Sequence, residues 1–440
     1  MPPGSPNAPK PPNPAMSKDL LDYHDALNTL LQTHQPMVRS QTLPLAQLHG
    51  RILAEDLPVR LDVPNFDNSA MDGYAICGAD RSSWQVVQRI AAGDAAQGPA
   101  LQPGQAARIF TGAPIPAGAQ AVLMQEHVTH DASQGEIALA PGQAIRPGQH
   151  IRCRAEELQA GATLLSRGTR LNPATIGLLA IQGYAQAPVL APLRVTVFSS
   201  GNELVQPGQP LQPGQIYDSN RVMLLSWLQA LGFAAIDGGA LPDQLAATRE
   251  ALQRAAQRSD AILCSGGVSV GEEDHLKRAL EQVGTLVQWR LFIKPGKPFT
   301  WGHIARSAQS SAGDGAGEPP CRVFMLPGNP VSSLVTFQQL ALPALRRLGG
   351  LDAQRARPLQ WQAQANFSRS KPEPRREFVR VRLEPGPQGW QATPLAQQGS
   401  NMLSGAAFAN ALAETAPGAQ IAHGDALTVY PLFDTLFDTL

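Results

Sequence analysis

The sequence predicts an α/β and β multidomain protein, with a parallel α/β domain, a split helical domain, an inserted β domain and a C-terminal β domain. Three observations lead to this class. Between residues 194 and 330, near-continuous apolar runs alternate with amphipathic helical patterns, which is typical of a parallel sheet covered by helices. Residues 57–153 contain short apolar runs between Gly/Pro turns, which indicates a small β domain. Alternation typical of strands resumes after residue 350, in EFVRVRL, GWQATPL and ALTVYPL.

The N-terminal region is predicted to be a tail followed by helices. Residues 1–16 are so rich in proline that we expect a disordered tail. Ser17 can cap a helix on which apolar residues recur at helical spacing, and residues 45–56 show a second, shorter helical pattern. The apolar residues of the first helix are Leu20, Tyr23, Leu27 and Leu30. Residues 17–56 are therefore expected to form the first part of a helical domain.

The helical domain is expected to resume after an insertion. Residues 57–153 form the inserted β domain, with strands expected at WQVVQRI, AARIF, AVLMQEHV and GEIALA. Residues 154–190 return to helix-compatible patterns, with Pro173 at a first helical turn, and are expected to complete the helical domain.

Residues 191–349 are predicted to form the α/β domain. Its strands are expected at RVTVFSS, FAAIDGGAL, AILCSGG, LVQWRLFI and CRVFMLPG, and its helices at residues 221–231, 244–257 and LKRALEQV. Residues 308–320 have low complexity and suggest a mobile surface loop. Residues 350–440 are assigned to the C-terminal β domain.

Composition excludes several classes of function. The 440 residues carry 35 basic and 35 acidic side chains, so no global field attracts nucleic acid or an anionic membrane. The four cysteines are far apart and the nine histidines show no metal-ligand spacing, which argues against a zinc site or a disulfide framework. The longest apolar window, residues 175–193, is too interrupted to span a bilayer, and no secretory signal is visible. A cytoplasmic protein is expected.

Five turns of the α/β domain are the candidate site. Each follows a strand-like run, and ligands bind beyond the carboxyl ends of strands in such sheets. The turns are SSGNEL (199–204), LPDQ (241–244), SGGVSVGEEDH (265–275), KPGKP (294–298) and LPGNPVSS (326–333). Their carboxylates are hard oxygen ligands, whereas lysines and glycine N–H groups bind anions, a combination that indicates a divalent cation, typically Mg²⁺, bridging to phosphate. Glu203 and Asp274 could instead cap helices.

Segments of the inserted β domain also carry candidate residues. LDVPNFDNSAMDGYAI contains Asp62, Asp67 and Asp72, which suit the edge of a site but equally suit Asx turns. TGAPIPAG offers Thr111 in a stiff loop, or is a plain β-domain loop. The charged run of residues 146–157 is typical of a solvated face, with anion steering as the alternative.

Together these motifs closely resemble the molybdopterin molybdenumtransferase family, the enzymes related to the E domain of gephyrin. The resemblance runs from about residue 17 to the C-terminus. The motifs that carry it are DVPNFDNSAMDGYA, TGAPIP, SSGNEL, GQIYDSN, SGGVSVGEEDH, KPGKP and LPGNPVSS, in the order and spacing of the family. They imply four domains in a homodimer that places molybdenum on the dithiolene of adenylylated molybdopterin, using molybdate and Mg²⁺ and releasing AMP.

The resemblance also implies roles for individual residues. The implied catalytic residues are Asp72, Thr111, Glu203, Asp243 and Asp274, of which Glu203, Asp243 and Asp274 serve the metal. The implied substrate-binding residues are Gly266, Gly267, Ser269, Lys294, Lys297, Pro327, Pro330, Arg380 and Ser400. Asp72 and Thr111 would reach the site of the partner subunit from the β domain. The adenylyltransferase that makes the substrate is a further implied partner.

Three departures and two alternatives accompany the resemblance. The chain has Ala155 and Glu157 where the family has glycine and aspartate, Asn202 where an aspartate is common, and Pro374 where a glycine often stands. One alternative is the molybdopterin adenylyltransferase, which shares the α/β domain but lacks the two β domains. The other is a scaffold or carrier that has lost catalysis, against which the intact Glu203, Asp243 and Asp274 argue.

Overall fold

The structure is a computed structural model that divides the chain into two compact units. It describes residues 20–433 apart from residues 38, 96–97, 132–134, 243, 268–274 and 307–318. The first unit comprises Met1–Ser40 and Leu190–Leu440, and the second comprises Gln41–Val189. The predicted tail and most of the predicted loop at 308–320 therefore lie outside the described residues.

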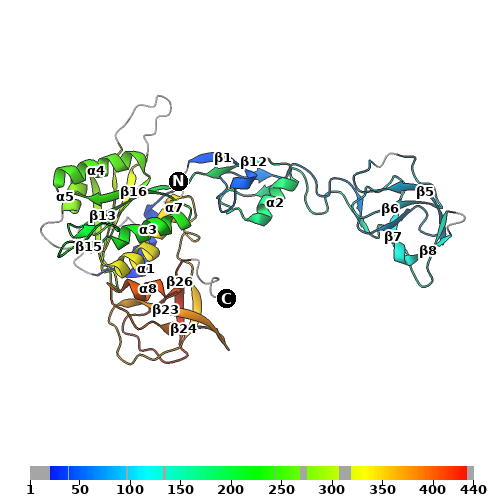
Figure 1. Ribbon diagram of the computed structural model, residues 1–440. Helices are drawn as coiled ribbons and strands as arrows, with labels where there is room; N and C mark the ends of the chain where they lie inside the picture. Colours follow the sequence, from blue (N-terminus) through cyan, green and yellow to red (C-terminus); the bar gives the residue numbers. More distant parts are fainter. Residues whose placement is uncertain are drawn as a thin grey trace, which may run out of the picture. The chain divides into compact units, whose positions relative to one another are not determined.

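The first unit is built on a six-stranded sheet with the order β16-β13-β17-β21-β20-β18. Figure 1 labels two of its strands, β13 and β16. The strands are β13 (Arg194–Ser200), β16 (Ala234–Leu241), β17 (Ala261–Ser265), β18 (Gly284–Arg290), β20 (Pro298–Ile304) and β21 (Cys321–Leu326). β16, β13, β17 and β21 are parallel, as predicted, but β20 pairs antiparallel with both of its neighbours. The connection from β18 to β20 is too short for the crossover that a parallel pair requires.

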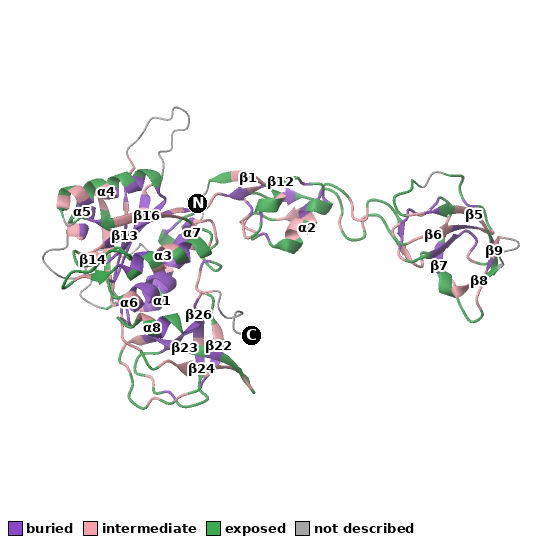
Figure 2. Ribbon diagram, viewed as in Figure 1, coloured by how far each residue is buried: buried purple, intermediate pink, exposed green. Residues whose placement is uncertain are grey.

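Two groups of helices cover opposite faces of this sheet. α4 (Leu245–Arg258) and α5 (His275–Val283) pack on one face, in a core with Ile262 and Val323. The other face is covered by α1 (Tyr23–Thr33), α3 (Ser219–Ala230) and a continuous segment formed by α6 (Pro330–Thr336), the π-helical η3 (Phe337–Ala341) and α7 (Leu342–Leu348). Buried residues are concentrated on the strands between these layers (Figure 2). The predicted α/β domain is confirmed.

The first unit also contains the C-terminal β domain that the alternation after residue 350 predicts. Its strands have the order β19-β23-β24-β22-β26-β25, and β23 pairs additionally with β25. They are β19 (Ile293–Lys294), β22 (Trp361–Ala365), β23 (Arg376–Gly386), β24 (Gly389–Pro394), β25 (Ala411–Thr415) and β26 (Ala426–Pro431), with the short helix α8 (Leu403–Ala407) before β25. Because β19 precedes β20 in the chain, it joins the α/β part to this domain.

The second unit contains a six-stranded sheet and a small helical part. The sheet has the order β7-β4-β6-β5-β9-β8, which confirms strands at all four runs predicted for the β domain. Its strands are β4 (Gly73–Ile76), β5 (Ser83–Ile90), β6 (Gln105–Ile109), β7 (Ala121–Met124), β8 (Val128–Asp131) and β9 (Glu136–Leu139), with the 3₁₀ turn η2 (Gln125–His127) between β7 and β8. Three short pairs flank it: β1 (Ser40–Pro44) with β12 (Gln186–Leu190), β2 (Leu57–Pro58) with β11 (Thr163–Leu165), and β3 (Asn68–Ser69) with β10 (Ile151–Arg152).

The helical predictions are right in part. α2 (Pro173–Ile181) has Pro173 in its first turn, as predicted, and Asn172 caps it by accepting from Thr175 N. The first helix begins at Tyr23 with Asp22 as its cap, whereas Ser17 lies outside the described residues. The helix predicted over 45–56 is wrong, because only the 3₁₀ turn η1 (Leu45–Gln47) forms. Gly50 then adopts a φ of 74°, and the backbone N–H groups of Leu53 and Ala54 donate to the carbonyls of residues 169 and 188 instead of forming helical bonds.

Histidine 34 ends α1 inside the apolar core. Its side chain is completely buried, with Nδ1 bonded to Leu30 O at 2.8 Å and its ring centroid 5.2 Å from that of Trp301. Within the described part of the chain, Nε2 has no hydrogen-bond partner. Burial lowers the pKa of His34 to about 4, from the ordinary value of 6.5. The folded protein therefore holds this histidine neutral where the unfolded chain would protonate it.

We expect His34 to make the protein sensitive to acid. Between pH 6.5 and 4 the unfolded state binds the extra proton, so stability falls as pH falls, by about 1.4 kcal/mol per unit and about 3 kcal/mol in all. His34→Phe retains a planar ring and removes the titration. Urea unfolding at pH 7, 5.5 and 4 should show the variant losing about 3 kcal/mol less than the wild type. Equal losses in both proteins would contradict this account.

None of the described helices is long and apolar enough to cross a membrane.

Candidate functional site

A pocket of the first unit lies at the carboxyl ends of the central strands. β13 pairs with β16 on one side and with β17 on the other, so the direction of winding reverses between β13 and β17. Such a switch point leaves a crevice in which doubly wound sheets bind ligands. The pocket there has a volume of about 910 Å³ and is lined by the turns after β13, β17, β19 and β21. The predicted convergence of these four turns is thus observed.

Close backbone approach explains the glycine at the switch point. Gly266 follows β17 with a φ of 95°, and a Cβ atom there would lie 2.4 Å from the carbonyl oxygen of Ser200. Its N–H donates to Leu326 O, which ties the turn to β21. A side chain would force apart the ends of β13 and β17, so this position requires glycine.

Glu203 supplies the carboxylate on the β13 side. A Cβ atom on Gly201 would lie 2.6 Å from Glu203 Oε2, so the carboxylate is folded back over its own turn. Glu203 lines the pocket. Its carboxylate is a hard oxygen donor of the kind that Mg²⁺ takes.

The first turn of α3 forms a second wall, and a buried ion network fixes it. Asp218 caps the helix by accepting from Arg221 N, and Arg221 Nε donates to Asp218 Oδ2 at 2.8 Å. Arg221 Nη1 also contacts both oxygens of Asp237 at 2.5 and 2.6 Å. Burial opposes the charge of Arg221, but the two carboxylates outweigh it and raise its pKa. The guanidinium therefore stays charged and holds the GQIYDSN turn in place.

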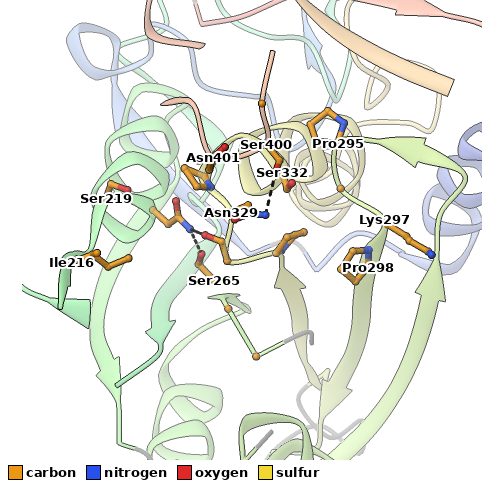
Figure 3. Close-up of a pocket in the computed structure, with 18 of the residues that line it drawn as sticks. Ile216, Ser219, Ser265, Pro295, Lys297, Pro298, Asn329, Ser332, Ser400 and Asn401 are labelled. Carbon is orange, nitrogen blue, oxygen red and sulfur yellow. Dashed lines mark hydrogen bonds between the residues drawn. The ribbon is translucent and has the colours of Figure 1, made fainter. Parts of the chain in front are cut away.

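Two asparagine side chains each donate to a serine in this pocket (Figure 3). Asn220 Nδ2 donates to Ser265 Oγ at 2.8 Å and to Gly328 O at 2.7 Å. Asn329 Nδ2 donates to Ser400 Oγ at 3.2 Å. The first bond joins α3 to the end of β17, and the second joins the turn after β21 to the C-terminal β domain.

The basic groups of the pocket come from the KPGKP turn and from the C-terminal domain. Lys294 Nζ lies 2.9 Å from Glu373 and 3.0 Å from Glu377, and the bond to Glu373, supported by Glu377, raises the pKa of Lys294. Its charge is thus largely neutralised by the protein. Lys297 also lines the pocket, and no ion pair is recorded for it among the described residues. Lys297 is therefore better placed than Lys294 to meet an anion.

Arg380 does not lie where the sequence analysis expects a substrate contact. Its side chain is completely buried, and its guanidinium donates to Gln397 O at 2.8 Å and to Gly399 O at 3.1 Å. These carbonyls belong to the loop that carries Ser400. Arg380 therefore does not line the pocket but supports this loop. The prediction failed because the apolar alternation along β23 does not show which arginine of this region faces the pocket. The arginine of this domain that lines the pocket is Arg375.

The remaining predicted residues fall into two groups. Those that line the pocket are Glu203, Gly266, Gly267, Lys294, Lys297, Pro327, Pro330 and Ser400. Asp243, Ser269 and Asp274 lie outside the described residues, so their roles stay predictions. No cluster of three metal-ligating side chains occurs among the residues that the structure describes. The sequence analysis missed Asn220 and Asn329, although the motifs GQIYDSN and LPGNPVSS contain them.

Asp72 and Thr111 form a pair in the second unit. The backbone N–H and the hydroxyl of Thr111 both donate to Asp72 Oδ1 at 2.8 Å. These bonds lower the pKa of the exposed Asp72 carboxyl. Two residues 39 positions apart are thus joined through one carboxylate oxygen.

The loop of residues 152–160 is held by the aspartates of the upstream segment. Arg154 Nε contacts Asp62 at 2.6 Å, and Arg154 N donates to Asp67 at 2.7 Å. Ala155, where the resemblance implies a glycine, has a φ of 61°. An L-residue with a Cβ atom is strained in this left-handed region.

Ala155→Gly should therefore stabilise the second unit. Removing the Cβ relieves about 1–2 kcal/mol of strain, against which the more flexible unfolded chain costs about 0.5–1 kcal/mol. The net gain in unfolding free energy is expected to be about 0.5–1 kcal/mol, measured by denaturant unfolding. Ala160→Gly in the same loop, where φ is negative, is the matched control and should destabilise. A loss of stability in Ala155→Gly would contradict this reading of the loop.

The sheet order and its pocket define a doubly wound α/β protein that binds a ligand at its switch point, extended by further β domains. Comparisons with known proteins specify this class. Residues 196–347 match the family model of the probable molybdopterin binding domain, and residues 21–183 and 362–432 match the MoeA N-terminal region (domain I and II) and the MoeA C-terminal region (domain IV). The chain belongs to the molybdopterin molybdenumtransferase family.

Individual relatives agree with this assignment. The chain is 37% identical to the molybdopterin molybdenumtransferase of Haemophilus influenzae, over 88% of this chain and 92% of the relative. It is 36% identical to that of Nostoc sp., over 79% and 78% of the two chains. The crystal structure of the molybdopterin biosynthesis moeA protein from Pyrococcus horikoshii OT3 aligns with a TM-score of 0.76, at 27% identity, over 94% of this chain and all of that one.

Proposed function

We propose that this protein is a transferase that inserts molybdenum into molybdopterin in molybdenum cofactor biosynthesis. The observation that carries the proposal is the pocket at the switch point. It lies in the part of the chain that matches the molybdopterin-binding family model, and the C-terminal β domain completes its wall with Arg375 and Ser400. Relatives at 36 and 37% identity bear the name of this activity.

We further propose that the substrate is adenylylated molybdopterin and that molybdate and Mg²⁺ are required. The pocket combines the carboxylate of Glu203 with the cations Lys297 and Arg375, which suits an anionic substrate that arrives with a divalent cation. Asp243 and Asp274 would complete the metal ligands with Glu203. When bound, Mg²⁺ would neutralise charge on the phosphates while water cleaves the phosphoanhydride bond, which leaves one phosphate on molybdopterin and releases AMP.

The chain's own residues would contribute mainly by positioning the substrate. The side chains around the pocket are fixed by buried bonds, such as those of Arg221 and Arg380, before any ligand binds. Preorganised donors of this kind stabilise developing charge without reorganisation. We also propose a cytoplasmic homodimer in which Asp72 and Thr111 act on the partner's pocket, and an encounter with the adenylyltransferase that supplies the substrate.

The test is release of AMP from purified adenylylated molybdopterin. We expect release when both molybdate and Mg²⁺ are present, and loss of release when Mg²⁺ is removed with EDTA and recovery when it is restored. Binding of the substrate without AMP release under these conditions would contradict the enzymatic proposal. ATP consumption with free molybdopterin would instead identify an adenylyltransferase.

A further inference from the structure

The hydrogen bonds of Asn220 fix the direction of a donor chain in the pocket. Asn220 is buried, and Nδ2 uses one hydrogen on Gly328 O and the other on Ser265 Oγ. A carbonyl oxygen can only accept, so the nitrogen must face Gly328 and cannot exchange places with Oδ1. The orientation of the carboxamide is thus fixed, and both of its N–H groups already donate hydrogen bonds within the protein.

This orientation determines what Ser265 can do. Its hydroxyl oxygen accepts from Asn220, and its single proton must therefore point elsewhere. No acceptor for that proton is recorded among the described residues, and Ser265 lines the pocket (Figure 3). A hydroxyl that accepts a hydrogen bond is polarised and donates more strongly. The Ser265 hydroxyl is therefore available as a hydrogen-bond donor at the wall of this pocket.

The arrangement has a cost that a purely structural asparagine would not need to carry. Asn220 Oδ1 is buried and has no hydrogen-bond partner among the residues that the structure describes. An unsatisfied buried acceptor costs about 1–3 kcal/mol, and such groups in native proteins call for a reason. Retaining the amide where a smaller apolar residue would avoid this cost is consistent with a role in binding.

A second pair in the same pocket repeats the pattern. Asn329 Nδ2 donates to Ser400 Oγ, and the Ser400 carbonyl accepts from Val331 N at 3.0 Å, which anchors this serine to the start of α6. Ser400 also lines the pocket, as do Lys297 and Arg375, of which Arg375 pairs through Nε with Glu373 at 3.1 Å. Two polarised hydroxyls and two cations in one pocket suit an anion that has several equivalent oxygens.

We propose that Asn220 is a positioning residue that makes Ser265 a dedicated hydrogen-bond donor to a tetrahedral oxyanion, with Ser400 as a second donor held by Asn329. The oxyanion is free molybdate or a phosphate group of the substrate, which share this geometry and charge. The identity of the oxyanion rests on the proposed function, whereas the direction of the donors does not.

The test measures binding of sodium molybdate and of inorganic pyrophosphate to the full-length protein by calorimetry. Ser265→Ala should weaken binding of the recognised oxyanion by about 10- to 100-fold, as expected for a hydrogen bond to a charged group. Asn220→Asp should weaken it at least as much, because the new carboxylate takes the Ser265 proton. Loss with molybdate alone or with pyrophosphate alone identifies the oxyanion, and either result supports the proposal.

A double variant and a charge control separate this role from simpler effects. If the two residues act through one chain, Asn220→Asp with Ser265→Ala should bind no more weakly than Asn220→Asp alone. Asn401→Asp, in an exposed residue of the same pocket, measures what an added charge does by itself and should cost less than Asn220→Asp. Circular dichroism melting checks folding, and Ser265→Ala keeps the test valid if Asn220→Asp fails to fold.

Three results would overturn the proposal: wild-type affinity in Ser265→Ala, additive losses in the double variant, or no binding of either oxyanion by the wild type at millimolar concentration. The outcome is separable from that of the proposed function. If the wild type transfers molybdenum and Ser265→Ala binds both anions normally, the proposed function is supported and the donor chain is contradicted. Loss of anion binding in the variants, with no molybdenum transfer by the wild type, would support the donor chain and contradict the proposed function.

Discussion

Gly266→Ala is expected to be among the most damaging single substitutions in the first unit. Alanine at a φ of 95° carries a backbone strain of about 1–2 kcal/mol, and its Cβ would lie 2.4 Å from the Ser200 carbonyl oxygen. That oxygen belongs to the main chain of β13 and cannot swing away as a side chain can. We expect the free energy of unfolding to fall by about 2–4 kcal/mol, together with loss of ligand binding as the ends of β13 and β17 separate.

The matched control is Gly328→Ala. Gly328 lines the same pocket, but its φ is not in the left-handed region, and the nearest atom to an added Cβ is Gly266 Cα at 3.9 Å. Its unfolding free energy should change by less than about 1 kcal/mol. Urea unfolding followed by circular dichroism measures both variants. Similar stability losses in the two would show that close approach at the switch point is not what requires glycine at Gly266.

Arg380→Leu is the second substitution with a large expected effect. It removes the charged donor of two carbonyls in the loop that carries Ser400, and a hydrogen bond to a charged group contributes about 1.5–3 kcal/mol. Leucine removes the desolvation cost that lowers the pKa of Arg380, which offsets part of this loss. We expect a net destabilisation of about 3 kcal/mol and faster amide exchange in residues 397–401. Arg380→Lys should retain only part of the stability that Arg380 provides, because one ammonium group cannot bond to both carbonyls as the planar guanidinium does.

Arg382→Leu provides the control for Arg380→Leu. Arg382 lies two residues further along β23, is exposed, and pairs only with Glu384 at 3.1 Å among the described residues. Its replacement should change stability by no more than about 1 kcal/mol. If Arg380→Leu is as stable as Arg382→Leu and still lowers affinity for the substrate, then Arg380 contacts the ligand directly and its assignment as a support of the loop is wrong.

The pocket could be predicted from sequence because its parts obey a topological rule. Apolar runs place β13, β17 and β21 in one parallel sheet, and the carboxyl ends of parallel strands meet at one edge. SSGNEL, SGG and LPGNP therefore had to converge, although they are up to 130 residues apart. The same reasoning gave the β domain of the second unit, since period-two alternation between turn residues is a local signal.

Other features depend on contacts that have no local signal. The helix expected over 45–56 does not form, because Gly50 turns the chain and the backbone that follows bonds to residues more than 100 positions away. Arg375 directly precedes β23 and Arg380 lies on it, and only the packed structure shows which of them is buried. The bonds of Asn220 join three segments that are distant in sequence, so a side-chain role of this kind emerges only once the strands are in place.

The measurement that tests the central claim most directly is the ligand environment of molybdenum after one turnover. The protein would be incubated with adenylylated molybdopterin, ⁹⁸Mo-labelled molybdate and Mg²⁺, and the product examined by X-ray absorption at the molybdenum K edge. The account predicts molybdenum bound by the two dithiolene sulfurs, with AMP released in equal amount. Molybdenum that keeps the all-oxygen environment of molybdate, in a protein that still binds the pterin, would contradict it.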